Sequence, residues 1–501
     1  MADDPRLPKP QRAPQAPPVK QTVPLTGGAY SARSVIANAQ RCVNLFPETN
    51  PPVESPPVQV THYLTPGLVT LLQPAAATVR AVYRASNGAL YVVVGTNVYF
   101  IDTSFNATLQ GTIAAGTTPV SLADNGSIVV LVDNTTAGYW ISLAAPGLNT
   151  IVDPAFYGAR RVCYLDGFFV FNRPNTNQFY LSPPFWNGVD PFDATYIASK
   201  TGGPDQIISI AVVNGNLWLV GQITSEVWYN VGAADFPFAR QPGVFVEHGM
   251  LRGWTIWEAD VEVFWLGRDK QGIAVVFMGK DYQAIRVSNY ALEDILQGYG
   301  QDNLNDASGF TYQQGGHTFY VLVLPNANAT WVYDISTGLW HERTWTNPGT
   351  GQEQRSRVNC GAFAYGYMIV GDHSNGKIYK WDLDAYNDDG DPIVRRRGFP
   401  HLVAGGDRIS YASFQIDMAV GTPSGGPSTE NVYVRWSDTR GETWGVPVAL
   451  PLGFGTTNQF YQSPKIWRLG MARDRVFEVY WSFNYQTALQ GAWITLEKAE
   501  T

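Results

Sequence analysis

The sequence predicts an all-β protein built around a β-propeller, and three features support this prediction. Short runs of β-branched and aromatic residues recur along most of the 501-residue chain. Tight-turn dipeptides such as Asn-Gly and Asp-Gly separate these runs, and they supply the positive φ angles that two-residue hairpin turns require. The pattern recurs roughly every 40–50 residues, the period typical of propeller blades. Only residues 290–297 have a helical pattern.

Seven repeating units lie between residues 79 and 383, and each is predicted as strand, hairpin turn, strand, loop and strand. One unit, at residues 251–287, is looser than the others. A single blade cannot bury both of its faces, so such units stack radially. The boundaries allow six or seven blades. The turns are Asn87-Gly88, Asn125-Gly126, Asp166-Gly167, Asn214-Gly215, Gly315-Gly316, Tyr365-Gly366 and Asn375-Gly376.

The remaining chain divides into four parts. Residues 1–28 are rich in proline and are predicted as an extended arm without helix or strand, which becomes ordered only against other chains. Residues 29–78 lead into the propeller at 79–383, and residues 384–406 are predicted as a linker. Residues 407–501 are predicted as a C-terminal β-sandwich, because their strands alternate apolar and polar residues between Gly-rich turns.

The composition is acidic, aromatic and poor in charge. The net charge is −8, and charged residues make up 15% of the chain against roughly 25% in ordinary globular proteins. An acidic chain is a poor candidate for sequence-specific DNA binding, which usually uses basic patches. The 13% of aromatic residues favours surfaces that are buried against partner subunits.

Cysteine use and apolar runs suggest where the chain is assembled. Cys42, Cys163 and Cys360 are odd in number and far apart, which favours assembly in a reducing cytosol over a disulfide framework. The N-terminal residues have no apolar run of the kind found in secretory signals. The longest apolar runs are too short to span a bilayer, so no membrane insertion is expected.

No pattern typical of catalysis, cofactor binding or metal binding is present. The histidines have no zinc spacing, and no P-loop or nucleophile elbow occurs. Residues 384–397 place Gly390 at position six of an EF-hand loop. However, Ala385 and Arg396 stand at positions one and twelve, where calcium needs carboxylates. We therefore predict no catalytic, cofactor-binding or metal-binding residues.

Two local features have structural interpretations. Four residues fit the Asp-box of sialidases, but Thr439 stands where the aspartate belongs; the four are Ser437, Gly441, Thr443 and Trp444. This box is a hairpin turn without a catalytic role. Arg395, Arg396 and Arg397 form the only basic run of the chain. They are candidates for contact with phosphate or an acidic partner, and the alternative is a solvated linker face.

Several segments, spread over about residues 29–496, resemble a known family. The residues that carry the resemblance are Asn38, Gln40, Asn44, Phe46, Glu48, Gly221, Glu226, Trp228, Pro237, Gly243, Trp265, Gly267, Gly441, Trp444 and Trp467. Each segment is weak alone, but their shared order and spacing are specific. They resemble the packaged-DNA-stabilisation proteins, also called tail nozzle or tail-hub proteins, of short-tailed phages. The resemblance implies that these residues are structural or interface positions, and the Pro-rich arm departs from the family's pattern.

The resemblance implies a structural virion protein of a phage tail and not an enzyme. Such subunits form a ring, typically of six copies, which extends the DNA channel below the portal and adaptor and helps to retain and then release packaged DNA. The implied partners are the adaptor protein above, tail fibre, spike or needle proteins nearby, and DNA that passes without sequence specificity. The implied location is the virion tail, after assembly in the host bacterial cytoplasm.

The sequence also predicts how the ring would work. We expect its channel to be lined by acidic and uncharged polar side chains, because tight phosphate contacts would slow DNA. Two alternatives stay open at this stage. A receptor- or sugar-binding tail propeller could stack sugars on exposed Trp and Tyr. A glycosidase or depolymerase would need paired carboxylates around a cleft.

Overall fold

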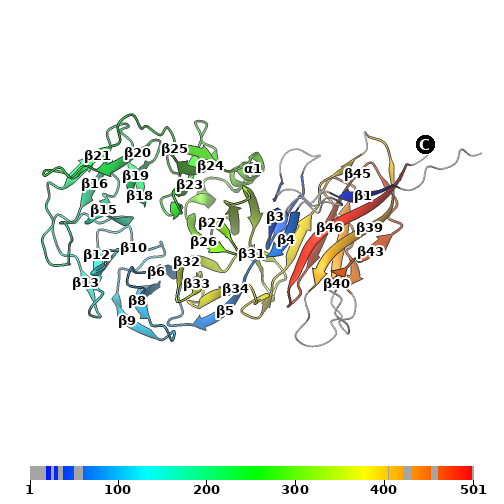
Figure 1. Ribbon diagram of the computed structural model, residues 1–501, viewed down its shortest axis with the longest axis horizontal. Coiled ribbons are helices and arrows are strands. Elements are labelled where there is room, and N and C mark those ends of the chain that lie inside the picture. Colours follow the sequence, from blue (N-terminus) through cyan, green and yellow to red (C-terminus); the bar gives the residue numbers. More distant parts are fainter. Residues whose placement is uncertain are drawn as a thin grey trace, which may run out of the picture.

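The computed structural model describes residues 19–23, 28–31, 38–49, 60–403, 406–420, 431–452 and 461–498. This part of the chain is almost entirely β-structure, with one α-helix, α1 (Tyr290–Tyr299), and one short 3₁₀ turn at Asp302–Leu304. Figure 1 shows a disc of radially arranged sheets beside an elongated pair of sheets. None of the described helices is both long and apolar enough to cross a membrane.

The disc is a β-propeller, as the sequence predicted. Six of its blades consist of four antiparallel strands that follow one another along the chain. The blades are, in order, β6 (Val79–Arg84), β7 (Leu90–Val94), β8 (Asn97–Ile101) and β9 (Ala107–Thr112); β10 (Ser121–Asp124), β11 (Ile128–Val132), β12 (Gly138–Ser142) and β13 (Leu148–Thr150); β14 (Val162–Leu165), β15 (Phe168–Asn172), β16 (Gln178–Leu181) and β17 (Ile197–Ser199); β18 (Ile207–Val213), β19 (Asn216–Gly221), β20 (Ser225–Asn230) and β21 (Phe238–Arg240); β22 (Trp257–Ala259), β23 (Glu262–Arg268), β24 (Ala274–Lys280) and β25 (Gln283–Arg286); β26 (Ser308–Gln314), β27 (His317–Leu324), β28 (Ala329–Asp334) and β29 (Leu339–Glu342).

A seventh four-stranded unit completes the disc and joins its two ends. It contains β32 (Val358–Ala364), β33 (Tyr367–Asp372) and β34 (Ile378–Asp382), and its outer strand is β5 (Gly67–Leu72). Because β5 precedes the first blade in the sequence, its antiparallel pairing with β34 closes the ring non-covalently. The short strands β35 (Asn387–Asp388) and β36 (Asp391–Pro392) extend this sheet.

Turn chemistry and packing between blades explain why these residues form a disc. Several hairpin turns place the first residue and the glycine at positive φ, as at Asp166 (47°) and Gly167 (92°). The apolar core is divided into separate layers, most of which lie between neighbouring blades. Phe171 of β15, for example, packs on Phe156 of the preceding loop with ring centroids 5.5 Å apart. Each blade therefore needs a neighbour on both faces.

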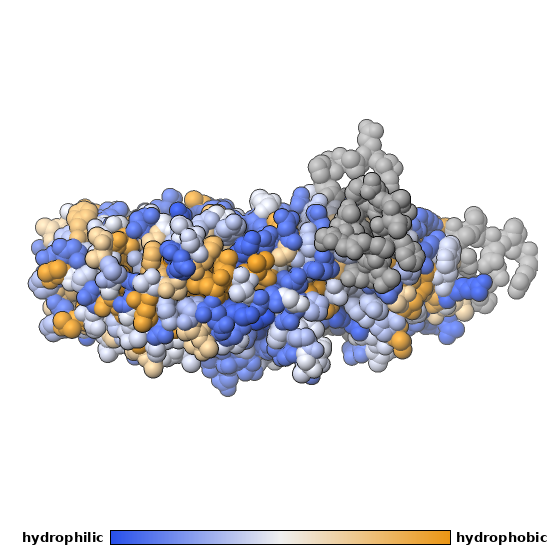
Figure 2. Space-filling view, turned by 90° about the horizontal axis from the view of Figure 1, so that it is seen from below, coloured by the Kyte–Doolittle hydropathy of each residue, from blue (hydrophilic) through white to orange (hydrophobic). Residues whose placement is uncertain are grey.

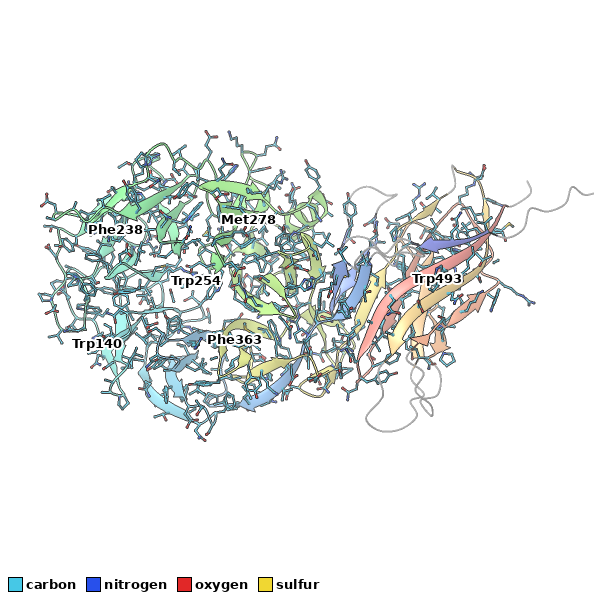
Figure 3. All side chains as sticks on the ribbon, in the orientation of Figure 1. Trp140, Phe238, Trp254, Met278, Phe363 and Trp493 are labelled. Carbon is cyan, nitrogen blue, oxygen red and sulfur yellow. The ribbon has the colours of Figure 1, made fainter. Side chains whose placement is uncertain are left out.

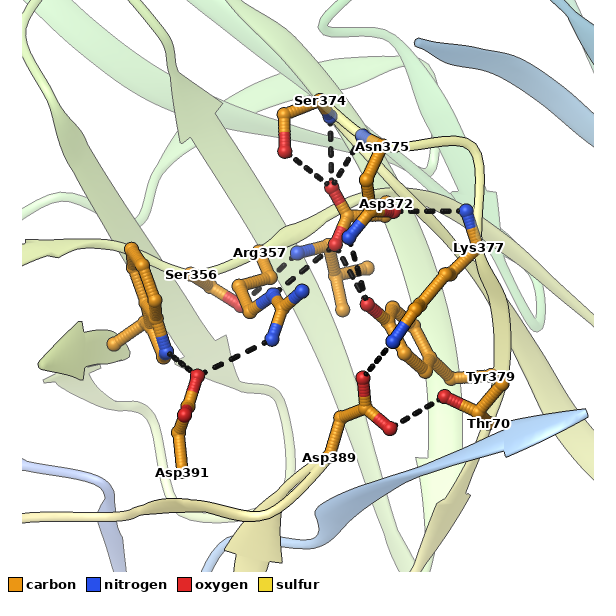
Figure 4. A network of polar contacts seen from close by, with 12 residues as sticks. Thr70, Ser356, Arg357, Asp372, Ser374, Asn375, Lys377, Tyr379, Asp389 and Asp391 are labelled. Atoms are coloured by element: carbon orange, nitrogen blue, oxygen red, sulfur yellow. Dashed lines mark hydrogen bonds and ion pairs between the residues drawn. The ribbon is translucent and has the colours of Figure 1, made fainter. Parts of the chain in front are cut away.

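A polar network fixes the closing sheet (Figure 4). The Asp372 carboxylate accepts hydrogen bonds from Ser374, from the Tyr379 hydroxyl at 2.7 Å and from Arg357 Nε at 3.1 Å. Burial alone would raise the pKa of Asp372, but these donors outweigh it and lower the pKa. In the same network, Asp389 accepts hydrogen bonds from the Thr70 hydroxyl of β5 and from Lys377 Nζ, both at 2.5 Å.

The elongated part consists of two sheets that face each other. The first contains the long strands β39 (Ile409–Val420) and β46 (Thr487–Lys498). It also contains β1 (Val19–Val23), β3 (Leu45–Thr49), β4 (Val60–Leu64), β42 (Tyr461–Gln462), β43 (Lys465–Trp467) and β44 (Met471–Ala472). Between the sheets, the Phe414 ring stacks on Phe477 with centroids 4.2 Å apart.

The second sheet is continuous with the propeller. From β29 of the sixth blade, the ladder runs through β2 (Cys42–Val43), β37 (Arg395–Gly398), β45 (Asp474–Trp481), β40 (Asn431–Ser437) and β41 (Val448–Pro451), with β38 (Leu402–Val403) beside β45. A two-stranded sheet, β30 (Thr344–Thr346) and β31 (Glu353–Arg355), lies between the sixth and seventh blades in the chain. Shared backbone hydrogen bonds therefore join the two parts.

The structure differs from the expected division of the chain. The stretch predicted as a linker, 384–406, supplies β35 and β36 to the sheet of the closing blade and β37 and β38 to the second C-terminal sheet. The segment 29–78 is divided between the C-terminal sheets, through β2 to β4, and the closing blade, through β5. Such two- to six-residue strands are too short to show a recognisable period. Some of them, such as β5, also pair with a strand that lies hundreds of residues away.

The prediction for the Pro-rich arm is wrong in part. Residues 1–18 lie outside the described residues. Residues 19–23 were expected to lack a strand, but they form β1, which pairs antiparallel with β46 of the same chain. The sequence VKQTV has an apolar residue at each end, and Val23 is buried against the core.

The closing strand leads to a prediction about stability. A Cβ on Gly67 would lie 2.4 Å from the carbonyl oxygens of Ala385 and Asn387. We expect Gly67→Ala to lower the free energy of unfolding by about 1–3 kcal/mol, as overpacking of rigid backbone does. Guanidinium denaturation would measure it. Gly298→Ala, in α1 with open space around the new methyl group, is the control and should be neutral or slightly stabilising. Equal stability of the two variants would contradict closure through β5.

Candidate functional site

The residues of the family resemblance lie mainly in two structural clusters and not in one reactive site. The first cluster joins the N-terminal segment to the propeller and the C-terminal sheets. The second lies in the fourth and fifth blades. The first contains Asn38, Gln40, Asn44, Phe46, Glu48 and Gly441, and the second contains Gly221, Glu226, Trp228, Pro237, Gly243, Trp265 and Gly267.

Asn44 joins the segments of the first cluster through its side-chain hydrogen bonds. It is buried and has a φ of 54°, a conformation that asparagine tolerates better than most residues. Its Nδ2 donates to the backbone oxygens of Thr344 at 3.0 Å and Val394 at 2.8 Å, while its Oδ1 accepts from the Thr344 amide at 3.0 Å. One side chain thus ties together three segments that lie far apart in the sequence.

The other members of this cluster pack around the same junction. Phe46 is buried, and its ring lies edge-on to Phe319 of the sixth blade. Gln40 forms a β-bridge with Tyr30, and the Asn38 carbonyl oxygen lies 2.9 Å from Nε2 of His401. A Cβ on Gly441, whose φ is 92°, would lie 2.6 Å from Cβ of Ala39. The remaining member, Glu48, is half-exposed, with its carboxylate 3.7 Å from Nε2 of His317.

Three arginines and three glutamates alternate across the same junction. Arg41 bridges Glu342 at 2.7 Å and Glu353 at 3.0 Å. Arg396 bridges Glu353 at 2.6 Å and Glu478 at 2.8 Å, and Arg435 pairs with Glu478 at 2.6 Å. These six side chains, here called the junction network, come from the N-terminal segment, the propeller and the C-terminal sheets.

The structure corrects the interpretation of the basic run. Arg395 and Arg397 are fully buried, and Arg396 belongs to the junction network. Arg395 donates to the carbonyl oxygens of Phe483 and Tyr386, and Arg397 donates to that of Gly28. Arg395 and Arg397 cannot reach a phosphate or face solvent, because β37, on which they lie, pairs with β2 and β45 inside a sheet.

The second cluster serves the packing of the fourth and fifth blades. Glu226 is fully buried, and it accepts hydrogen bonds from the Gly202 amide and from Trp228 Nε1, the latter at 2.9 Å. Trp265 Nε1 donates to the Gly249 carbonyl oxygen at 3.1 Å. A Cβ on Gly267 would lie 2.4 Å from that same oxygen. These residues are therefore required by close backbone approach and by buried hydrogen bonds.

The remaining signature residues have different surroundings. Gly221 leaves no room for a side chain, because a Cβ would lie 2.4 Å from Asp205 Oδ2. Gly243 has a φ of 73° and open space around it, and Pro237 accepts a backbone hydrogen bond from Val231. In the C-terminal part, Trp444 lies under the guanidinium of Arg435, whereas Trp467 is 62% exposed.

The centre of the propeller contains a cavity of about 400 Å³. It is lined by residues from the inner strands of all seven units. Trp254, labelled near the centre of the disc in Figure 3, lines both this cavity and a second one. Two of the three free cysteines, Cys163 and Cys360, line the central cavity, and burial raises the pKa of each thiol to about 12. Both therefore remain protonated and unreactive near neutral pH.

Charged groups within the central cavity are held by the surrounding protein. Arg161 donates to the Ile256 carbonyl oxygen at 2.7 Å and lies over the Trp257 ring. Burial raises the pKa of Glu258, although the nearby Arg161 opposes this. The Val212 amide donates to Glu258 at 3.2 Å. No group of three or more possible metal-ligating side chains occurs among the described residues.

A second cavity of about 500 Å³ adjoins the central one, because Pro119, Trp254, Ser308 and Asn359 line both; it is here called the mouth of the propeller. Three arginines line it, namely Arg160, Arg252 and Arg355. The sequence does not show that these arginines lie together, because they are about 90 to 100 positions apart in the chain. The feature that they share in the sequence is their position, since each lies shortly before the first strand of a blade.

The junction network leads to a second prediction. Burial would raise the pKa of Glu353, but Arg41 and Arg396 outweigh it and lower the pKa. The stabilisation that this lowered pKa provides is complete above the pKa of the unfolded chain and is lost as the pH falls through the folded-state value. We expect Arg396→Gln to cost about 1–3 kcal/mol at neutral pH and to weaken this acid dependence.

Denaturant unfolding as a function of pH tests this expectation. Lys270→Gln is the matched control, because Lys270 pairs with Glu247 on the surface, where their side chains are 78% and 60% exposed. It should change stability by no more than about 0.5 kcal/mol. If the two variants behave alike, the junction network does not hold the two parts together.

Comparisons with known proteins identify the family. The family model described as "Bacteriophage P22 Gp10, beta-propeller" matches residues 21–386. No curated protein matches the chain. The WD40 β-propeller domain of Doa1 is 10% identical, with a TM-score of 0.39, over 63% of this chain and 96% of that chain. The computationally designed Ika8 protein is 12% identical, with a TM-score of 0.37, over 68% of this chain and 99% of that chain. Because the family model covers most of the chain, from β1 through the closing blade, this protein belongs to the P22 Gp10 family of phage packaged-DNA-stabilisation, or tail nozzle, proteins.

Proposed function

We propose that this protein is a ring-forming nozzle subunit, which extends the DNA channel of the phage tail and helps to retain and then release packaged DNA. Six copies would form the ring below the adaptor protein, with tail fibre, spike or needle proteins nearby. The protein would act without an active site, a cofactor or a metal ion. The family membership supports the tail location, and the following features of the chain support the mechanism.

The size of the central cavity is the observation that carries the proposal. At about 400 Å³, it is comparable to a small-molecule pocket and far smaller than a DNA duplex requires. DNA therefore does not pass through a single propeller. A channel for DNA has to form between copies of the chain, with each propeller as a solid wall segment.

A rigid connection between the propeller and the C-terminal part fits the role of a channel wall. The sheet that runs from β29 into β2, β37 and β45 joins the propeller to the C-terminal part by backbone hydrogen bonds, and the junction network lies beside it. Packaged DNA pushes on such a wall, and a hinge between the two parts would let it deform. The signature residues of the junction act in this proposal as structural positions.

An apolar patch on the propeller rim is the proposed ring contact. It comprises Val152, Phe185 and Val189, whose exposed fractions are 89%, 75% and 78%. The two loops that carry them are joined by a hydrogen bond from the Phe192 amide to Asp153. Trp140, labelled at the edge of the disc in Figure 3, lies beneath Gly188 of the second loop. Apolar side chains also gather on the propeller half of the face in Figure 2.

The acidic net charge of the chain is compatible with a channel that binds the DNA phosphates only weakly. The net charge of −8 disfavours tight phosphate contacts, each of which would add a salt-dependent hold on DNA. The only basic run, 395–397, is buried or paired and adds no exposed phosphate contact. We propose that acidic and uncharged polar side chains line the assembled channel, and that exposed Trp467 serves a subunit or partner contact.

Assembly tests this function. We expect the purified full chain to form a closed ring, with mass photometry giving a multiple of the 55.1 kDa subunit. Val152→Asp together with Val189→Asp should shift the population to monomers, because a buried unpaired charge is costly at an interface. Val446→Asp, at a valine of the C-terminal part that is 86% exposed, is the matched control and should leave the ring intact.

Two outcomes would contradict the proposal. A chain that stays monomeric at all concentrations and is located on tail fibres in virion images would favour the receptor- or sugar-binding alternative. A reconstruction of the ring with arginine and lysine lining the channel would refute the proposal that the channel binds DNA phosphates only weakly.

A further inference from the structure

One mouth of the propeller is lined by more arginine than carboxylate side chains. Arg160, Arg252 and Arg355 line the 500 Å³ cavity there. Among the described residues that line it, Asp306 is the only carboxylate. None of the three arginines makes a salt bridge within the part of the chain that the structure describes. The lining thus holds three arginines and one carboxylate, while Asp302 and Asp372 act on Arg252 and Arg355 from outside the lining.

The arginines are incompletely satisfied as hydrogen-bond donors. Arg355 is 91% buried, since its exposed fraction is 9%, and its Nη1 has no hydrogen-bond partner in the described structure. Nε of Arg252 is likewise buried without a partner there, while its Nη1 donates to the Leu251 carbonyl oxygen. Asp306 Oδ1 is also buried without a partner, so the described lining has two unpaired donors and one unpaired acceptor. Buried guanidinium donors without acceptors are costly, and the donor left over points to an acceptor from outside.

The lowered pKa values of the arginines also indicate that an anion would be favourable in this cavity. Burial and the neighbouring Arg252 both lower the pKa of Arg160. Burial lowers the pKa of Arg355 to about 10, although Asp306 opposes this. His373, which also lines the cavity, has its pKa lowered to about 4 by burial and by Arg355, so it is neutral at physiological pH. The three arginines remain charged, and an anion would relieve their mutual repulsion.

The protein holds one of these arginines in place. Arg160 donates from Nε to Asn134 Oδ1 at 3.1 Å and from Nη1 to the Ile208 carbonyl oxygen at 2.8 Å. Its side chain lies across Gly253, where a Cβ would approach Arg160 Cδ to 2.5 Å. The glycine next to Arg252 therefore makes room for Arg160, and both arginines line the cavity.

The shape of the cluster indicates the class of ligand. The arginines come from the entrances to the third, fifth and seventh blades, so they approach the cavity from three sides of a ring. A carboxylate offers two oxygens in one plane, whereas a tetrahedral oxyanion offers acceptors in several directions. Guanidinium groups bind phosphate oxygens with strong charge-assisted hydrogen bonds.

We propose that this mouth of the propeller binds an oxyanion of the phosphate class, either inorganic or carried by a small molecule such as a nucleotide. The cavity is larger than a single phosphate ion and has room for a chain of phosphates or a nucleotide. The proposal does not depend on ring formation, because all of its residues belong to one chain.

Isothermal titration calorimetry on the full chain tests the site. The probes are inorganic phosphate, tripolyphosphate and adenosine triphosphate, each at constant ionic strength adjusted with sodium chloride. We expect saturable binding that weakens at least about tenfold in Arg252→Gln and in Arg355→Gln, because each removes a charged hydrogen-bond donor. Arg84→Gln, at an exposed arginine of β6, is the matched control and should bind as the unmodified chain does.

Thermal unfolding separates binding from folding. Tripolyphosphate should raise the melting temperature of the unmodified chain and of Arg84→Gln, since a ligand stabilises the state that binds it. It should not raise that of Arg252→Gln or Arg355→Gln. Equal affinity for tripolyphosphate and adenosine triphosphate would assign recognition to the phosphates alone, and tighter binding of the nucleotide would assign it to the nucleotide. Absence of saturable binding, or unchanged affinity in both folded variants, would overturn the proposal.

Discussion

Closure of the propeller ring is the constraint on which the rest of this structure depends. Each blade has two apolar faces, and neither can be covered by the blade itself. The core is accordingly divided into layers, most of which lie between neighbouring blades, and the layer between the seventh and first blades exists only if the ring closes. Strand β5 provides that closure by pairing with β34, and the buried Asp372 carboxylate fixes the hairpin of β33 and β34 with which it pairs.

The same strand explains why the two parts of the molecule form one unit. The chain passes through the C-terminal sheets as β2 to β4 before it reaches β5, so closing the ring also anchors those sheets. The junction network adds alternating charges across this boundary, and the Asn44 side chain satisfies backbone groups of two distant segments at once. Partly buried charges of this kind need their partners, because removal of one member leaves another uncompensated.

Ring geometry also creates the mouth with its three arginines. All inner strands of a propeller run in the same direction, so the residues that precede them gather on one face of the disc. Arg160, Arg252 and Arg355 occupy such positions and meet at one cavity despite their separation in the chain. Figure 3 places Trp254, which lines both this cavity and the central one, near the centre of the disc. A structural wall and a small-anion site can therefore occupy the same fold without competing for residues.

The sequence by itself determined the class of the fold and the blades, because strand alternation and turn dipeptides such as Asp166-Gly167 act within a few residues. It also determined the family, since the order of its motifs is a property of the chain. Only the tertiary structure decided where the isolated segments belong. It placed β5 in the closing blade, β37 inside a sheet and β1 beside β46, and it buried Arg395 and Arg397. The arginine mouth was hidden for the same reason. Pairing and convergence between residues hundreds of positions apart depend on ring closure, and no local pattern records that closure.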